Sequence, residues 1–147
     1  MVNKKIISQE HFIKRLLNIL LRSGLSEFPS DYTNLHVLLK SAILTLDKTA
    51  IFSEKEINQN LDYWISNISN LTPMKDIDHV TLRRMLVDAE YLTRNRDGSC
   101  YQVSLSGDGQ PVFDDAIEQV DVIAVIKSGR EEIARRKREY MEKLNSP

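Results

Sequence analysis

The sequence predicts a mainly α-helical fold with a small β-hairpin, namely a winged helix-turn-helix domain with extra helices at its N- and C-terminal ends. Two observations lead to this class. Apolar residues recur at steps of three and four along most of the 147 residues, which is the periodicity of helices. Between residues 28 and 104 the predicted elements follow in the order helix, short strand, capped helix, helix and hairpin. We therefore divide the chain into an N-terminal helical extension (1–27), a winged-helix-like domain (28–104) and a C-terminal helical extension (105–147).

The first predicted helix runs from about Gln9 to Ser23. Ser8 is a typical N-cap residue, and Gly24 is a typical C-cap residue. The apolar side chains of this segment spread over more than half of the helix circumference, which is wider than the single stripe of a surface helix. We expect this helix to be covered on two sides, by its own core and by another element or another subunit.

Three elements follow the turn-rich segment "SEFPSDYTN". Apolar periodicity predicts a helix from Asn34 to about Asp47, and the run Ala50–Phe52 predicts a short strand. Ser53 and Glu56 have the spacing of a capping box, in which each side chain accepts a hydrogen bond from the backbone amide of the other residue. They open a further helix, which the long polar stretch "SNISNLTPMKDI" is expected to end.

The next helix begins after Asp78 or Asp76, either of which can cap it. We expect its core face to consist of Leu82, Met85, Leu86 and Ala89. After Leu92 the apolar period changes to two, and Asp97-Gly98 lies between two short extended arms, which is a strong local signal of a β-hairpin. This hairpin is the wing of the predicted domain.

The segment after the hairpin is predicted to be helical once the linker "SLSGDGQP" has ended. The apolar residues from Phe113 to Ile126 suit a helix, although the β-branched run "VDVIAVI" also suits a strand. Ser128 and Glu131 form a second capping box around Gly129, which predicts a break and a new helix there. The final segment is mostly charged, with a thin apolar stripe of Ile133, Tyr140, Met141 and Leu144.

Composition and charge narrow the functional classes. Twenty basic and twenty-one acidic residues give a net charge of −1, so binding to nucleic acid or to an anionic membrane needs a local patch. The densest basic run, "ARRKRE", lies within helical reach of several glutamates, which are expected to neutralise it. Neither a membrane span nor a signal peptide is expected. The single cysteine, Cys100, excludes an intramolecular disulfide and fits the cytoplasm, where we place the protein.

The sequence contains no motif for catalysis or metal binding. The histidines His11, His36 and His79 are far apart in sequence and have no metal-ligating partners nearby. The chain lacks a glycine-rich phosphate loop and a recognisable set of nucleophile, base and oxyanion donors. We therefore expect no enzyme activity, no catalytic residues, no metal and no cofactor.

Three stretches carry a resemblance to a known family: Phe28-Pro29, "SEKEIN" from Ser53 to Asn58, and "DHVTLRRMLVDAEYLTRNRDGSCY" from Asp78 to Tyr101. Over about residues 28–103 the chain resembles DUF2087, a bacterial domain-of-unknown-function family often found beside or within predicted transcriptional regulators. The resemblance implies a winged-helix-like fold and a regulatory or DNA-linked role, and it implies no particular chemistry. The chain departs from the family pattern after Phe28-Pro29, where "SDYTNLH" replaces a helix start rich in lysine and arginine.

The candidate contacts with double-stranded DNA lie on the helix after Asp78 and on the hairpin. The first turn of such a helix approaches the groove edge, and a wing can lie along the phosphate backbone. Arg84 can instead pair with Asp88 one turn further on, and the hairpin can instead be merely solvated. The candidate DNA-binding residues are His79, Thr81, Arg83, Arg84, Arg94 and Arg96, of which the last two are expected on one face of a strand.

The outer face of the same helix supports a second hypothesis. A recognition helix usually presents polar or cationic side chains to base edges, but here Val80, Val87 and Tyr91 surround Arg84. These three residues form a candidate interaction face, covered by the N- or C-terminal helix or by a second subunit. We therefore predict a DNA-binding transcriptional regulator that self-associates as a dimer. The alternative is a protein-interaction or oligomerisation module that keeps the winged-helix frame without binding DNA.

Overall fold

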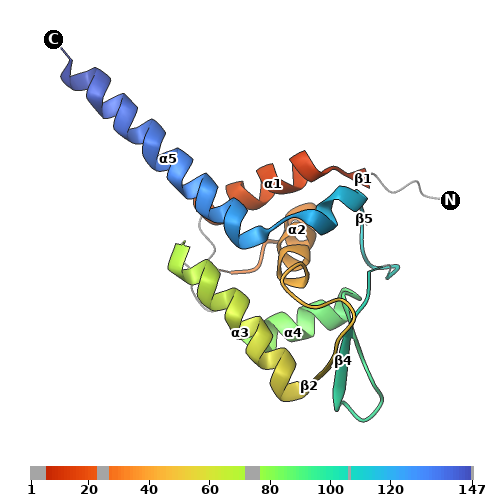
Figure 1. The fold of residues 1–147 in the computed structure, drawn as a ribbon. Coiled ribbons are helices and arrows are strands. Elements are labelled where there is room, and N and C mark those ends of the chain that lie inside the picture. The colour runs from red at the N-terminus through yellow and green to blue at the C-terminus, as the bar shows by residue number, and fades with distance from the viewer. Residues whose placement is uncertain (1–5, 23–26, 72–76, 106, 147) are drawn as a thin grey trace.

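The computed structural model describes residues 6–22, 27–71, 77–105 and 107–146. The chain is mainly helical and has two small β-sheets (Figure 1). The helices are α1 (Gln9–Leu17), its continuation in the π-helical turn η1 (Asn18–Arg22), α2 (Tyr32–Ile43), α3 (Glu54–Leu71), α4 (His79–Asp88), the 3-10 helix η2 (Asp115–Gln119) and α5 (Val122–Asn145). The strands are β1 (Ile6–Ile7), β2 (Ile51–Ser53), β3 (Leu92–Arg94), β4 (Cys100–Val103) and β5 (Val112–Phe113). Among the residues described, no helix combines the length and the apolarity needed to cross a membrane.

The predicted hairpin is confirmed, and it belongs to a three-stranded antiparallel sheet in the order β2-β4-β3. Its turn lies at Asp97-Gly98. Gly98 has a φ of +75°, a conformation that residues with a side chain rarely adopt. The Asp97 carboxylate accepts hydrogen bonds from the backbone amide and the hydroxyl of Ser99, at 2.9 and 2.6 Å. Both turn residues therefore fix where the chain reverses.

Three predicted helix caps are also confirmed. The Ser8 hydroxyl accepts a hydrogen bond of 3.1 Å from the amide three residues further on. Ser53 and Glu56 exchange two hydrogen bonds, each 3.1 Å long, between side chain and backbone amide. The Asp78 carboxylate accepts a hydrogen bond of 2.7 Å from the Thr81 amide. These local interactions satisfy backbone amides that have no partner within the helix, so the helix starts follow directly from the sequence.

The hydrophobic core contains residues from each of the helices α1 to α5. α2 lies in its middle, since every residue from His36 to Ile43 is buried. Leu82 and Leu86 of α4 are fully buried, as predicted, and so is Trp64 of α3. The packing of α4 on α3 and α2 therefore sets which side of α4 faces outward.

Two helices extend further than the sequence predicts. α3 continues to Leu71, because Ile68 is fully buried one turn after Trp64 and so extends the apolar face of the helix. α5 runs through Gly129 without the predicted break. A Cβ on Gly129 would lie 2.7 Å from Leu17 Cδ2 and 3.1 Å from Leu21 Cδ1. This glycine permits the close approach of two helices and does not end one.

The two extensions pack against each other, which changes the predicted start of the C-terminal segment. Phe113 was expected in a helix, but it lies in β5, which pairs in parallel with β1 from the N-terminus. The run "VDVIAVI" is helical from Val122 onward, so its strand alternative is wrong. α1 contacts α2 as well as α5 and η2, which confirms that it is covered on two sides. The predicted cap at Gly24 lies outside the described residues.

Candidate nucleic-acid interface

α4 presents a polar face outward because its apolar residues anchor it in the core. Leu82 and Leu86 point inward, which leaves Thr81, Arg84 and Asp88 exposed on the opposite side. At the start of the helix, hydrogen bonds from the backbone and side chain of Thr81 hold the pKa of the capping Asp78 carboxyl below its usual value. This ionised cap stabilises the helix start, since a negative charge there interacts favourably with the helix dipole.

Three of the predicted arginines lie around one pocket between α4 and the hairpin. Its volume is about 290 Å³, and it is lined by Arg83, Arg84, Val87, Asp88, Arg94 and Tyr101. We call it the arginine pocket. Arg83 is paired with the Glu54 carboxylate. Arg84 and Arg94 nevertheless outnumber Asp88, so this surface is locally positive on a chain with a net charge of −1. It provides the local patch that contact with an anionic partner requires.

Arg83 connects α4 to two neighbouring elements. Its Nη1 donates a hydrogen bond of 2.5 Å to Asn58 Oδ1 and lies 3.3 Å from a carboxylate oxygen of Glu54, both on α3. Its guanidinium also lies 5.6 Å from the centre of the Tyr101 ring on β4. Only 15% of the Arg83 side chain is exposed. Arg83 therefore holds α3, α4 and β4 together, and most of its hydrogen-bonding capacity is directed at the protein.

Arg94 and Arg96 occupy different environments, contrary to the prediction that they share one face of a strand. β3 ends at Arg94, and Arg96 lies in the turn that follows, so strand alternation does not relate the two. The Arg94 guanidinium folds back along the hairpin, 5.9 Å from the centre of the Tyr101 ring, and a Cβ on Gly98 would overlap it. Arg96 is exposed.

Arg84 and Arg96 remain available to an external partner. Both side chains are exposed, and neither takes part in an ion pair within residues 6–22, 27–71, 77–105 and 107–146. The alternative pairing of Arg84 with Asp88 is therefore not formed in this part of the chain. His79, by contrast, contacts α3, because its Nδ1 lies 2.9 Å from Asp62 Oδ1.

The predicted interaction face is only partly present. Val80 is 38% exposed and Val87 is half-buried. Tyr91, however, is fully buried, and its hydroxyl lies 2.7 Å from His36 Nδ1. The prediction fails at Tyr91 because α4 ends at Asp88 and Glu90 has a φ of 65°, which turns the chain into the core. This burial raises the pKa of the Tyr91 hydroxyl.

The N- and C-terminal helices do not cover the outer face of α4. In Figure 1, α1 and α5 lie on the opposite side of α2 from α4. Val80 and Val87 therefore flank Arg84 on a face that is open within the described residues.

Tyr101 is a member of the arginine pocket that the sequence did not indicate, whereas Asp88 was considered only as a partner of Arg84. Tyr101 lies on β4 and is only 2% exposed. The sequence did not show that two arginines, one from α4 and one from β3, both lie near its ring. Contacts between an arginine and an aromatic ring fix the position of the guanidinium, so Tyr101 positions these arginines.

Within the described residues there is no group of three or more histidine, cysteine, aspartate or glutamate side chains that could hold a metal ion. The clustered charges of a second region, Lys40, Lys48 and Glu118, pair with one another at the junction of α2 and η2.

Comparison with protein-family models places most of the central part of the chain in a known family. A family model described as "Uncharacterized protein conserved in bacteria (DUF2087)" matches residues 24–103, slightly more than half of the chain. The matched segment contains α2, β2, α3, α4, β3 and β4, and hence the whole arginine pocket. No curated protein and no solved structure is significantly similar to the chain.

Proposed function

The chain belongs to the bacterial family DUF2087 through residues 24–103, and we propose that this region is a winged helix-turn-helix domain that binds double-stranded DNA and regulates transcription. The proposal is for a binding function and not for catalysis. The observation that carries it is the arginine pocket, in which α4 and the hairpin together present cationic side chains.

The order of elements supports the winged-helix assignment. A helix, a strand, two helices and a hairpin follow one another as α2, β2, α3, α4, β3 and β4. The first strand pairs with the last, so the sheet has the order β2-β4-β3 and the hairpin projects beside α4. In this arrangement α4 is the recognition helix, which enters the major groove, and the β3–β4 hairpin is the wing.

The distribution of charge supports contact with the phosphate backbone. Arg84 on α4, Arg94 on β3 and Arg96 in the turn are exposed. Arg84 and Arg94 line one pocket, so a phosphate there can contact helix and wing together. Arg83, held by Glu54 and Asn58, supports this surface from behind. Thr81, exposed in the first turn of α4, is the side chain best placed for a base edge.

The test measures binding of the full chain to labelled DNA duplexes by fluorescence anisotropy at several salt concentrations. If Arg84, Arg94 and Arg96 each contact one phosphate, the slope of log affinity against log salt is about −2.7, which corresponds to about 40-fold weaker binding at 200 mM than at 50 mM salt. Replacing all three by glutamate should abolish binding. Lys127→Glu makes the same change of −2 that each of these substitutions makes, but at an exposed residue of α5, and should leave binding nearly unchanged.

Two results would refute this proposal. One is the absence of duplex binding at 50 mM salt, and the other is a triple glutamate variant that binds as tightly as the parent chain. A sequence preference would additionally require that Thr81→Ala reduces affinity for the preferred fragment more than for random duplex, because phosphate contacts alone carry no sequence information.

A protein-interaction module remains the second candidate, and Val80 and Val87 on either side of Arg84 favour it. Apolar side chains gain most from burial against another apolar surface. In this case Val80→Asp would weaken binding to a protein partner, while the triple arginine variant would retain it. The two candidates are thus separated by which set of substitutions removes binding.

A further inference from the structure

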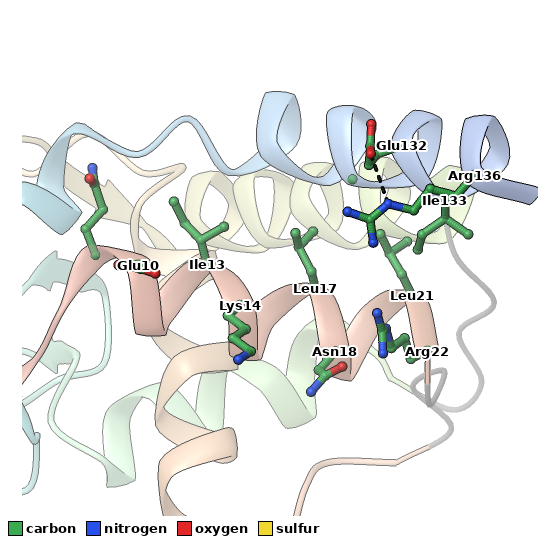
Figure 2. Close-up of a pocket in the computed structure, with 12 residues that line it drawn as sticks. Glu10, Ile13, Lys14, Leu17, Asn18, Leu21, Arg22, Glu132, Ile133 and Arg136 are labelled. Atoms are coloured by element: carbon green, nitrogen blue, oxygen red, sulfur yellow. Dashed lines mark hydrogen bonds and ion pairs between the residues drawn. The ribbon is translucent and has the colours of Figure 1, made fainter. Parts of the chain in front are cut away.

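A long groove runs between α1 and α5, far from the arginine pocket. It has a volume of about 710 Å³ and extends from Gln9 at one end to Arg136 at the other. Figure 2 shows Ile13, Leu17 and Leu21 of α1 and η1 pointing toward α5, where Ile133 points back toward them. Gly129 forms part of the wall, and its missing side chain brings the two helices together. The groove is therefore apolar inside and charged along its rim.

The second half of α5 projects away from the rest of the molecule (Figure 1). Ile126 is the last fully buried residue of α5, and the helix continues to Asn145. This projecting half carries large apolar side chains that are between 42% and 62% exposed, namely Ile133, Tyr140, Met141 and Leu144. A helical stretch of this length gains little stability by itself in water, because helices are stabilised mainly by packing.

We propose that the protein forms a two-fold symmetric homodimer in which the projecting half of α5 from each copy occupies the α1–α5 groove of the other. A two-fold interface must be self-complementary. If one patch of the first copy contacts a different patch of the second copy, the same two patches also meet with the roles of the copies exchanged. This chain carries both patches, an apolar groove and an unpartnered apolar stripe. The inference concerns assembly and does not depend on DNA binding.

Ile133 fixes the approximate position of the two-fold axis. It lines the groove and also begins the exposed stripe, so it must lie close to its own symmetry mate. α1 and α5 run in the same direction in Figure 2. An antiparallel α5 from the second copy then places its Tyr140 beside Leu17 and its Leu144 toward Ile13. The interface then contains α1 and α5 from each copy.

The dimensions of the two patches agree. The stripe from Ile133 to Leu144 is about 17 Å long, and the groove wall from Gln9 to Arg22 is about 20 Å long, at 1.5 Å per helical residue. The groove is lined by 12 residues and the segment from Ile133 to Asn145 has 13, of which Ile133 and Arg136 belong to both, so the two patches comprise 23 residues per copy. A stable interface of standard size uses roughly 20–30 residues from each partner. The contact is therefore large enough to hold a dimer together.

The charges around both patches are mixed, with a small excess of basic residues on each. The groove rim contains Glu10 and Glu132 as well as Lys14 and Arg136. On the projecting half, Arg135 pairs with Glu132 and with the glutamate four residues further on. This confirms that the basic run "ARRKRE" is neutralised in part by its own helix. Five basic and two acidic residues nevertheless lie between Ile133 and Asn145, so the contact depends on burial of the apolar stripe, and Glu10 and Glu132 are the acidic groups on the rim that can attract it.

The first test is sedimentation velocity of the full chain without DNA, over a range of concentrations. The parent chain should sediment as a dimer, and the double variant Tyr140→Glu/Leu144→Glu should have a dissociation constant at least about 100-fold higher, because two charges would have to be buried in an apolar groove. Tyr63→Glu is the matched control, since Tyr63 on α3 is 60% exposed and Tyr140 is 62% exposed. The control should remain a dimer.

The second test locates the two-fold axis by cross-linking. In a Cys100→Ser background, Ile133→Cys should form a disulfide between copies on mild oxidation, and Tyr63→Cys should not. A monomeric parent chain would overturn the proposal and leave the groove to a different protein. A dimer that survives the Tyr140→Glu/Leu144→Glu change, or that Ile133→Cys fails to cross-link, would overturn this interface. Since no DNA is present, none of these outcomes bears on the proposed DNA binding.

Discussion

Replacing Glu118 by alanine should destabilise the protein by about 3 kcal/mol, because it leaves a buried ammonium without its carboxylate. Lys40 lies in the middle of α2 and is only 2% exposed. Its Nζ donates a hydrogen bond of 2.6 Å to Glu118 Oε1 on η2 and lies 5.4 Å from the centre of the Phe113 ring. Lys48 contacts the other carboxylate oxygen. The Lys40–Glu118 ion pair therefore links the family domain to the C-terminal extension.

The magnitude follows from the burial of each partner. Removing one member of a buried ion pair typically costs about 3–5 kcal/mol, because the remaining charge is desolvated and uncompensated. Lys40 is buried to that degree, but the Glu118 side chain is 23% exposed, so water can reach the site left by Glu118→Ala. We therefore expect the lower end of that range. For a chain of this size it corresponds to a melting temperature lower by about 6–12 °C.

The assay is urea unfolding followed by the fluorescence of Trp64, the only tryptophan and a fully buried one. The double variant Lys40→Met/Glu118→Ala should recover at least half of the loss, since it removes the buried charge and keeps the apolar stem. Glu131→Ala, exposed on α5, is the control and should change stability by less than about 0.5 kcal/mol. A Glu118→Ala variant as stable as the parent chain would refute the reasoning, and so would a double variant less stable than Glu118→Ala alone.

The effect of pH gives a further check on the same pair. Burial alone would raise the pKa of Glu118, but hydrogen bonds from Lys40 and Lys48 outweigh it and hold that pKa below its usual value. A carboxyl whose pKa is lowered by folding contributes stability above its unfolded pKa and loses it as the pH falls through the folded value. The difference in stability between the parent chain and Glu118→Ala should therefore be full at neutral pH and shrink as the pH falls below the ordinary glutamate pKa of about 4.3. A difference that stays constant over this range would contradict the assignment.

Two smaller predictions concern local structure. Gly98→Ala should lower the free energy of unfolding in urea by about 1–2 kcal/mol, because φ is +75° and the new Cβ would displace the Arg94 guanidinium. The control is Gln102→Ala, at an exposed position on β4. Equal unfolding midpoints for Gly98→Ala and the parent chain would show that the turn does not need glycine. Ser53→Ala should cost about 1 kcal/mol through loss of the capping box, measured in the same way. Lys55→Ala, at an exposed position in the first turn of α3, should be nearly neutral, and a larger effect there than at Ser53 would contradict this explanation.

Much of the candidate site could be predicted from the sequence, because its elements are set by short-range interactions. The Asp78 cap, the inward Leu82 and Leu86, and the Asp97-Gly98 turn place α4 and the hairpin in order. This order brought Arg84 and Arg94 to one pocket, as the DNA hypothesis requires. The sequence did not reveal that Arg83 is held by the protein, since its partners on α3 lie 25 and more residues away.

The errors arose where a local pattern has two physical explanations. Tyr91 has the spacing of an outer helical face, but a left-handed residue at Glu90 ends the helical period just before it. Gly129 lies within a capping-box pattern, but it is a contact residue between helices. Polar "SNISNL" resembles a loop, but buried Ile68 continues the apolar face of α3. In each case the local structure depends on a packing partner that is distant in sequence, or on a backbone dihedral angle that the residue type alone does not determine.

The sequence by itself determined where helices begin, where the hairpin turns and which leucines face inward, because caps, turns and apolar periodicity act between residues only a few positions apart. Only the tertiary structure decided that Lys40 meets Glu118 across 78 positions, that β1 pairs with β5, and that α1 and α5 enclose an apolar groove. These contacts depend on the global path of the chain, and a linear pattern carries no information on which of many distant segments will become neighbours.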